Sequence, residues 1–534
     1  MTTAKSAFVV LCQLFYFAVA INTTVDLTCH KYTGISTLNG ITQWLGIRYA
    51  APPTGDLRFM PPEDPPCNST IQVADQHGKI CLATDDSPTN NATSEDCLFL
   101  DVYAPSNATT YSKLPVFFFI QGGGFNENSN PNFNGSSLIQ ASGYSIIVIT
   151  FNYRVGPYGF ITNGDLVTAN NGLRDQRKAL QWVKKYISQF GGDSGHVVLG
   201  GDSAGAASIS LQMTAYSGKN TDLFHAAAAE SVSFATVLTV EESQYQYDNF
   251  TARLGCTGDD SLACLRSKTA EELQEQNINM PYPGLTQAPL YTWNPVIDND
   301  LIDDYTYNSF TYGKFVKIPV IYGDDTNGGT VFAPQNTSTI EEGENFLQAQ
   351  FPYLKSLQLS QIESMYPNPN NTCPNVGCYW RQVSNVYGDL RYMCPGLYIS
   401  SAMSQYGVGS SFNYRWNVED PTQVADGYGV PHTAELHAIF GPENTGGDAP
   451  MSYYPNGTNA AVVPVIQAYW TSFIRSFDPN KYRYPGSAIW GKFNGWTQNR
   501  LLFETGGKTS MEAVDNDTRH RCQYFASIGV NIRQ

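Results

Sequence analysis

The chain has 534 residues, enough for a large buried core, and a formal net charge of −16 from 31 basic and 47 acidic side chains. Because proteins that bind phosphate backbones need a basic face, this charge argues against nucleic acid as a partner. No low-complexity linker or internal repeat divides the sequence, so we expect a single domain over residues 21–534.

The N-terminal segment, residues 1–20, has the pattern of a secretory signal peptide. Lys5 gives it a positive start, residues 7–20 are nearly all apolar, and Ala18-Val19-Ala20 forms an A-x-A cleavage site. This apolar run is too short for a comfortable membrane span, and no later segment is long and apolar enough for one. We therefore expect a secreted, extracellular protein without a membrane span once the signal is removed.

Strand-like and helix-like segments alternate along most of the chain. The clearest helix is expected over residues 175–190, with an apolar face that includes Leu180 and Val183. The alternation predicts the α/β class, with a large, mostly parallel central sheet flanked by helices. Residues 244–290, mostly helical and polar, are expected to be an insertion outside the sheet. The strand-like runs, apolar without polar alternation as in strands covered on both faces, are residues 116–120, 146–151, 197–199, 226–229, 320–322 and 412–416.

A glycine run, Gln121-Gly122-Gly123-Gly124-Phe125, directly follows the strand-like residues 116–120. Glycines allow the backbone to approach a ligand and to turn its N–H groups toward it. Taken alone, such a run is more typical of a flexible turn.

The pentapeptide Gly201-Asp202-Ser203-Ala204-Gly205 lies between the strand-like residues 197–199 and a small-residue, helix-like run over 204–212. This is the strand–turn–helix context of a G-x-S-x-G nucleophile elbow. The turn is so tight that a Cβ at either flanking glycine would strike the neighbouring strand or helix. We expect the Ser203 hydroxyl to be held out of the sheet at the positive end of a helix, as a nucleophile. An ordinary small-residue turn is the alternative.

Acyl transfer by Ser203 would also need an oxyanion hole and a base. The N–H groups of the glycine run and of Ala204 would supply three donors, each worth roughly 3 kcal/mol. The base should be a late histidine, because proteins with a G-x-S-x-G elbow carry their triad residues in the order serine, acid, histidine. His432 precedes a helix-like segment on a loop from which it can reach a cleft, whereas we expect His437 to cap or pack.

The cysteines fit an exported chain. Of eleven, Cys12 lies in the signal segment, and an even number remains, which favours disulfides over metal sites. No spacing resembles a zinc site, and we expect neither a metal nor a cofactor. The close pairs Cys256/Cys264 and Cys373/Cys378 suggest short closed loops, and we provisionally pair Cys29 with Cys67 and Cys394 with Cys522.

Sequons for N-linked glycans are frequent, and their density after a signal peptide predicts glycosylation at several of them. They begin at Asn22, Asn68, Asn91, Asn107, Asn134, Asn249, Asn336, Asn370, Asn456 and Asn516.

Motifs from one end of the chain to the other resemble the type-B carboxylesterase/cholinesterase family, most closely its secreted fungal members, over roughly residues 25 to 525. The motifs are Gly46-Ile47-Arg48-Tyr49-Ala50, Pro52-Pro53, Leu57-Arg58-Phe59, Ser94-Glu95-Asp96-Cys97-Leu98, Gly122-Gly123-Gly124-Phe125, Asn152-Tyr153-Arg154, Asp175-Gln176, Ala179-Leu180-Gln181-Trp182-Val183, Phe190-Gly191-Gly192-Asp193, the elbow, the His432 segment and Tyr469-Trp470-Thr471-Ser472-Phe473.

The resemblance implies an α/β-hydrolase fold with helical insertions and ester hydrolysis through an acyl-serine intermediate. It assigns the oxyanion donors to Gly123, Gly124 and Ala204. It also implies the disulfides Cys81–Cys97 and Cys256–Cys264.

One departure from the family concerns the catalytic acid, which in the family is a glutamate in a Glu-Gly-Thr motif after a late strand. Here Gly329-Thr330 aligns with the Gly-Thr, so Gly328 stands where the glutamate should be. The acid orients the histidine and stabilises its imidazolium, and replacing it in a serine protease costs about 10⁴ in turnover. A smaller departure is Asp202, where many relatives carry glutamate.

Three hypotheses follow from Gly328. In the first, Asp325 or Asp324 in the same loop takes the role of the acid, and we select Asp325. Alternatively, the enzyme is a weakened esterase that depends on Ser203 and the oxyanion hole. In the third, hydrolysis has been replaced by a cyclase or lyase reaction on a secondary metabolite, or by binding.

The substrate class is indicated by the loop between Cys81 and Cys97, which contains no aromatic residue and is short and polar. Cholinesterases carry a Trp there that binds quaternary ammonium by cation–π attraction, and lipase relatives carry a longer amphipathic lid. We therefore expect neither choline esters nor lipid droplets as substrates. The leading hypothesis is a secreted serine carboxylesterase acting on soluble, modest-sized carboxylic esters.

Overall fold

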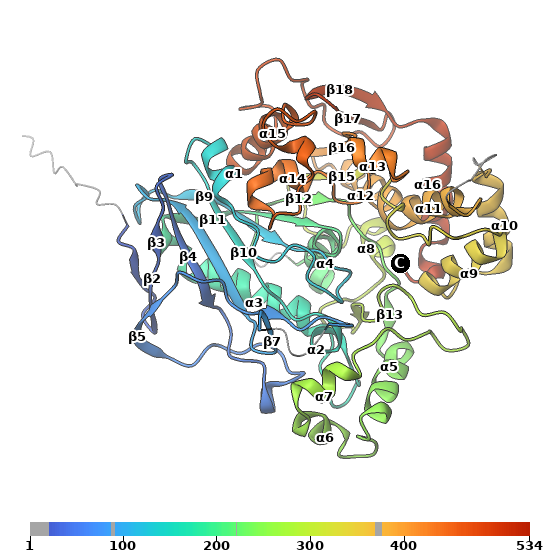
Figure 1. Cartoon of the computed structure of the whole chain (residues 1–534), viewed down its shortest axis with the longest axis horizontal. Coiled ribbons are helices and arrows are strands. Elements are labelled where there is room, and N and C mark those ends of the chain that lie inside the picture. Colours follow the sequence, from blue (N-terminus) through green and yellow to red (C-terminus); the bar gives the residue numbers. More distant parts are fainter. Residues whose placement is uncertain (1–20, 87–90, 220–221, 369–375) are drawn as a thin grey trace, which may run out of the picture.

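The centre of the molecule is an eleven-stranded sheet, seen in a computed structural model that describes residues 21–86, 91–219, 222–368 and 376–534 (Figure 1). The expected signal peptide and the sequon at Asn370 lie outside the described residues.

The strand order across the sheet is β18-β17-β16-β15-β12-β11-β9-β10-β8-β4-β3. Neighbours from β10 to β17 pair in parallel, and the outer pairs at both ends are antiparallel. The large, mostly parallel sheet is thus confirmed. Its strands are β3 (Ile35–Ser36), β4 (Ile41–Arg48), β8 (Phe99–Pro105), β9 (Leu114–Ile120), β10 (Ile147–Phe151), β11 (Gly192–Asp202), β12 (Ala226–Glu230), β15 (Val320–Asp325), β16 (Ser411–Asn417), β17 (Asn499–Glu504) and β18 (Lys508–Ala513).

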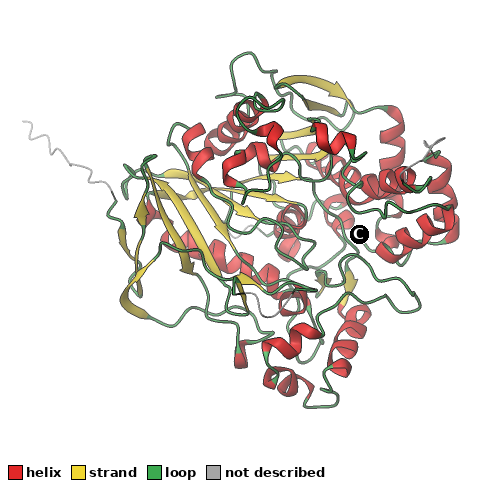
Figure 2. Cartoon of the chain, in the orientation of Figure 1, coloured by secondary structure: helices red, strands yellow, loops and turns green. Residues whose placement is uncertain are grey.

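Helices cover both faces of the sheet (Figure 2). Successive side chains of a strand point to opposite faces, and in the central strands both sets are buried. Phe118 and Leu199 enter one core with α3 and α4, whereas Phe117 and Val198 enter a second core with α1 and α15. This explains why these strands lack polar alternation in the sequence.

The expected helix over 175–190 is present as α3, which begins four residues earlier and continues as a 3₁₀ turn over Ile187–Phe190. The helices are α1 (Ser136–Ala141), α2 (Gly156–Phe160), α3 (Asn171–Tyr186), α4 (Ala204–Gly218), α5 (Val240–Arg253), α6 (Ser261–Ser267), α7 (Ala270–Glu275), α8 (Thr306–Thr311), α9 (Ile340–Gln350), α10 (Ser356–Met365), α11 (Trp380–Gly388), α12 (Cys394–Gln405), α13 (Pro421–Ala425), α14 (Leu436–Ile439), α15 (Val462–Ser476) and α16 (Asn516–Ile528).

The expected insertion over 244–290 is helical through α5, α6 and α7, which lie away from the sheet at the bottom of Figure 1. Beyond Glu275 it continues as loop up to Leu290. Short strands form three small sheets: β1 (Thr24–Asp26), β2 (His30–Thr33) and β5 (Asn68–Val73); β6 (Ile80–Cys81) and β7 (Thr93–Ser94); and β13 (Leu238–Thr239) and β14 (Val296–Ile297).

The disulfides follow the expected pairing. Bonds join Cys29 to Cys67, Cys81 to Cys97, Cys256 to Cys264, and Cys394 to Cys522. Cys378 is also disulfide-bonded, and its expected partner Cys373 lies outside the described residues. The last of the four bonds ties α16 to α12, far apart in the sequence.

Among the residues that the structure describes, no helix has the length and apolar character needed to cross a bilayer.

Candidate active site

Ser203 stands at the junction of β11 and α4, with φ 51° and ψ −117°. A non-glycine residue with positive φ is uncommon, and such strain of about 1 to 3 kcal/mol clusters at functional sites. The serine caps the N-terminus of α4 as the sequence predicts, so its hydroxyl stands at the positive end of the helix dipole.

Gly201 and Gly205, on either side of Ser203, lie against the end of β9, where there is no room for a side chain. A Cβ on Gly205 would overlap the carbonyl oxygen of Ile120, and one on Gly201 would lie 2.8 Å from the same atom. These distances confirm that the turn tolerates no side chain at either position.

The glycine run 122–124 lies beside the elbow. A Cβ on Gly122 would lie 2.9 Å from the Cβ of Ser203. Gly123 and Gly124 have φ values of 112° and 56°, which only glycine adopts readily. Within the described residues, neither of their N–H groups has a backbone acceptor. Ala204 is the first residue of α4, where N–H groups lack intrahelical partners.

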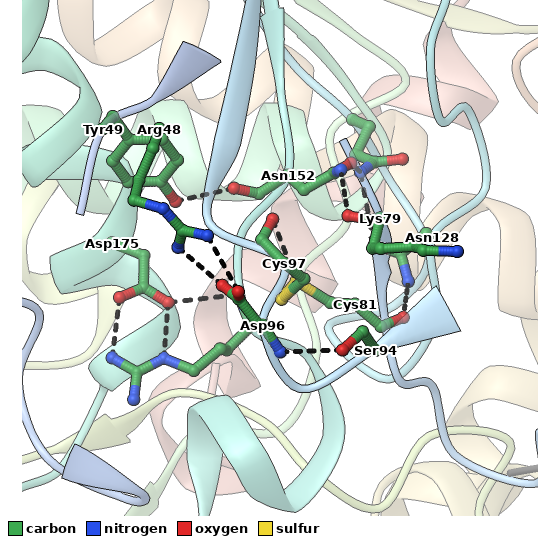
Figure 3. The surroundings of a disulfide bond; sticks show 12 residues. Arg48, Tyr49, Lys79, Cys81, Ser94, Asp96, Cys97, Asn128, Asn152 and Asp175 are labelled. Atoms are coloured by element: carbon green, nitrogen blue, oxygen red, sulfur yellow. Dashed lines mark hydrogen bonds and ion pairs between the residues drawn. A yellow bond between two sulfur atoms is a disulfide. The ribbon is translucent and has the colours of Figure 1, made fainter. Parts of the chain in front are cut away.

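The segment that follows the glycine run 122–124 is connected through Asn128 to the Cys81–Cys97 disulfide (Figure 3). Asn128, just after the glycine run, donates to the carbonyl of Cys81 at 2.8 Å, and Gln121 donates to Asn128 at 3.3 Å. Gln121 also donates to Asn152, whose carbonyl accepts from Tyr49 at 2.6 Å. Gln121 and Asn128 therefore link the glycine run to Asn152 and to the disulfide.

Asp202 supports the same loop. Its carboxylate accepts from the N–H of Gly122 at 2.9 Å and from the side chain of Asn130 at 2.7 Å. Burial raises the pKa of Asp202 to about 7, because the charged form loses its hydration and the nearby Glu435 repels it. Asp202 thus bonds both to backbone and to a side chain near the glycine run.

His432 lies in the loop before α14, where it packs against two aromatic rings that also contact each other. Its ring centroid is 4.1 Å from that of Tyr392 and 5.2 Å from that of Phe332. Both ring nitrogens are buried, and neither has a hydrogen-bond partner among the described residues. Burial and, to a lesser extent, the charge of Arg391 lower the pKa of His432 to about 3. The ring is therefore a neutral base over the ordinary pH range.

His437 has a different environment. Its Nδ1 lies 3.2 Å from the hydroxyl of Thr445, and its ring packs near Tyr453. This is the packing role expected from the sequence.

Gly328 lies beside the unpartnered imidazole. A Cβ there would lie 3.9 Å from His432 Nδ1 and 3.7 Å from the ring of Tyr392, both ordinary van der Waals distances. The loop of residues 325–329 also lines a polar cavity of about 590 Å³ together with Arg500 and Arg521. The position thus has room for a side chain that the sequence does not supply.

Asp325 has partners other than the imidazole. Its Oδ2 accepts from the Ser231 hydroxyl at 2.8 Å and from the N–H of Thr433 at 2.6 Å. Oδ1 of Asp324 has no partner among the described residues, and Oδ2 would lie 2.6 Å from a Cβ on Gly396. Burial raises the pKa of both carboxyls well above the usual range. Neither aspartate bonds to His432, and Asp325 instead fixes the backbone one residue away.

These contacts bring the elbow and the histidine loop to one edge of the sheet. The N–H of Ser203 donates to the carbonyl of Glu230, and the next residue, Ser231, bonds to Asp325. Asp325 in turn holds Thr433, the neighbour of His432. Ser203 and His432 are not hydrogen-bonded to each other in this state, although catalytic bonds often tighten only with substrate.

Two residues near the site were not predicted from the sequence. Glu435 accepts from the Tyr414 hydroxyl at 2.7 Å and lies beside Asp325, and burial raises its pKa. Arg391 is a buried cation on the π-helical turn Asp389–Met393 before α12. Glu435 stands three residues after His432, a spacing that could have drawn attention to it, whereas Arg391 lies in no recognised motif.

No group of three or more His, Cys, Asp or Glu side chains is arranged to hold a metal ion within the described ranges.

Comparison with known proteins identifies the family. The model of the carboxylesterase family matches residues 25–525. Secreted lipase 4 of Gibberella zeae is 30% identical over 94% of this chain and 90% of its own length. Lipase 1 of Geotrichum candidum is 28% identical over 88% of this chain and 91% of its own length.

A solved structure agrees with these sequences. The crystal structure of Aspergillus niger EstA superposes with a TM-score of 0.92 and 42% sequence identity, covering 96% of this chain and 99% of that one. The chain therefore belongs to the carboxylesterase family and is a carboxylic ester hydrolase with the α/β-hydrolase fold.

Proposed function

We propose that this chain is a secreted serine carboxylesterase that hydrolyses soluble carboxylic esters through an acyl intermediate on Ser203. The observation that carries the proposal is the strained elbow at Ser203 beside the N–H groups of Gly123 and Gly124, which have no backbone acceptor among the described residues. Strain of this kind at a functional site is maintained by the surrounding structure.

In the proposed reaction Ser203 Oγ attacks the ester carbonyl while His432 takes its proton. The N–H groups of Gly123, Gly124 and Ala204 bind the oxyanion of the tetrahedral intermediate. The intermediate collapses and the alcohol leaves with the proton from His432. Water then attacks the acyl-serine with His432 again as the base, and the carboxylic acid is released.

Asp325 is the carboxyl group that we propose to orient the base. It does so through the backbone, because its Oδ2 accepts from the N–H of Thr433 rather than from the imidazole. Packing against Tyr392 then fixes the plane of the His432 ring.

The substrate is proposed to be soluble because the loop closed by Cys81–Cys97 is short, polar and free of aromatic residues. Two relatives are named lipases, but a loop of this length offers no amphipathic lid. Hydrolysis of tributyrin should therefore show no jump when the ester exceeds its solubility.

Secretion is supported by the N-terminal pattern and by the relative named Secreted lipase 4. Glycosylation is supported by exposure of the sequon asparagines. Those exposed are Asn22, Asn68, Asn91, Asn107, Asn249, Asn336, Asn456 and Asn516.

The experiment compares Ser203→Ala with Ser210→Ala on a chromogenic acetate. Ser210 is a buried serine of α4 that bonds to Tyr322, so it controls for loss of a buried hydroxyl. We expect Ser203→Ala to lose hydrolysis and Ser210→Ala to keep it. Full activity in Ser203→Ala would refute the proposal.

Gly328 favours a second candidate, in which hydrolysis is weak and the site performs a cyclase or lyase reaction on a secondary metabolite, or binds it. A chain that is labelled at Ser203 but does not turn over simple esters would support this candidate.

A further inference from the structure

Arg391 is a buried cation that has no carboxylate partner in the part of the chain that the structure describes. Arg391 is 3% exposed, and its Nε donates to the hydroxyl of Ser233 at 2.9 Å. Within the described residues it forms no ion pair with a carboxylate. The buried guanidiniums of Arg58, Arg154 and Arg500 all contact carboxylates at 2.6 to 2.7 Å. A buried charge is costly unless it is paired, so Arg391 lacks the partner that the others have.

Neutral aromatic rings surround this charge. The guanidinium carbon of Arg391 lies 5.6 Å from the ring centre of Tyr291 and 5.7 Å from that of Tyr387. Burial raises the pKa of both phenols, which therefore stay protonated and supply no negative charge. Cation–π contacts stabilise the guanidinium without neutralising it, and its two terminal nitrogens remain available as donors.

Arg391 is linked through one intervening residue to Ser203, to the glycine run and to His432. Ser233, whose hydroxyl accepts from Arg391 Nε, donates its own N–H to the carbonyl of Ser203 at 3.3 Å. Tyr291 covers the glycine run, since a Cβ on Gly124 would overlap its ring. The next residue in the chain, Tyr392, packs on His432.

We propose that Arg391 binds a carboxylate carried by the substrate, so that the preferred esters of this chain are anionic. The inference rests on the proposed function, because it names the substrate class of the Ser203 site. A guanidinium presents paired N–H donors that match the two oxygens of a carboxylate. Because the chain carries a net charge of −16, long-range attraction does not favour such a substrate, and the local cation must provide the selectivity.

The test uses two pairs of esters that differ in one charge. On the acyl side, the para-nitrophenyl monoester of adipic acid is compared with para-nitrophenyl heptanoate. On the alcohol side, para-acetoxybenzoate is compared with its methyl ester. We expect the wild type to favour the anionic member of one pair by about 10- to 100-fold in kcat/KM, the worth of hydrogen bonds to a charged group. The pair that shows the preference identifies the side that carries the carboxylate.

The matched variants are Arg391→Gln and Arg391→Lys. We expect Arg391→Gln to lower kcat/KM of the anionic ester by about 10- to 100-fold more than kcat/KM of the neutral ester, so that the preference is removed. Arg391→Lys keeps the charge without the paired donors and should retain part of the preference. Equal losses on both members of a pair would overturn the proposal, as would a wild type that favours the neutral member of both. The wild-type comparison decides the question even if the variants do not fold.

A binding measurement separates this proposal from the proposed function. Adipate and benzoate should raise the melting temperature of the wild type but not that of Arg391→Gln, whether or not the chain hydrolyses esters. Absence of such a shift in the wild type would count against the carboxylate site. Hydrolysis that survives Ser203→Ala would instead overturn the proposed function.

Discussion

A side chain on Gly328 would begin 3.9 Å from the Nδ1 atom of His432. No other atom that it would meet is nearer than 3.7 Å, and the backbone there is not left-handed. Since Nδ1 has no partner among the described residues, a side chain at this position would have both room and an unpartnered nitrogen within reach.

Gly328→Glu should therefore raise ester turnover. A carboxylate beside Nδ1 would fix the tautomer of His432 and stabilise its imidazolium, and the gain should lie between about 10-fold and the 10⁴-fold effect of the acid in serine proteases. Steady-state kcat on a chromogenic acetate measures it. Gly328→Gln, which has the same size without the charge, should gain much less. No change in the glutamate variant would show that the native loop already supplies a working acid.

Asp325 can be tested as a positioning residue. Asp325→Asn keeps an oxygen for the N–H of Thr433, so we expect a loss in kcat within about 10-fold, whereas Asp325→Ala leaves that amide unpaired and should cost about 100-fold. Asp324→Asn is the control, because burial raises the pKa of Asp324 and the neutral acid resembles the amide. Equal, large losses in both Asp325 variants would indicate that its charge acts on the imidazole.

His432 and His437 should differ sharply. His432→Ala is expected to abolish turnover, whereas His437→Ala should retain most of it. The reason is that His437 contacts Thr445, whereas His432 packs on Tyr392. Since burial lowers the pKa of His432 to about 3, kcat/KM should show no loss from protonation of the base as pH falls through 6.5, the ordinary histidine pKa. Asp202, whose pKa is about 7, could also produce a step in this profile. A step in kcat/KM near pH 6.5 that persists in Asp202→Asn would therefore contradict the buried environment of His432.

Asp202 makes stability depend on pH. Its pKa is raised from 3.8 to about 7 in the folded chain, so its contribution to stability is complete below about pH 4 and is lost as pH rises to 7. At about 1.4 kcal/mol per pH unit, the loss is on the order of 4 kcal/mol. Urea midpoints at pH 5 and pH 8 should therefore differ less in Asp202→Asn than in the wild type. An unchanged difference would mean that Asp202 ionises normally when folded.

The sequence predicts those features that depend on neighbouring residues. The strands of the sheet centre are apolar on both faces, and the glycines beside Ser203 are set by the tight turn, so both can be predicted. The outer strands β4, β17 and β18 mix polar with apolar residues, and no strand was predicted there.

The contacts that define the site are long-range and could not be predicted. The bond from Thr433 to Asp325 spans 108 residues, and the one from Arg391 to Ser233 spans 158. Sequence alone identified Gly328 as a departure, but only the fold shows that it faces an unpartnered nitrogen.

The central claim, that Ser203 is the acylated nucleophile, is tested most directly by covalent labelling. Diethyl para-nitrophenyl phosphate should add one diethylphosphoryl group per chain, which peptide mass spectrometry places on Ser203, with parallel loss of esterase activity. Ser203→Ala should take up no label. A label on any other residue, or activity that persists in a fully labelled chain, would contradict the account.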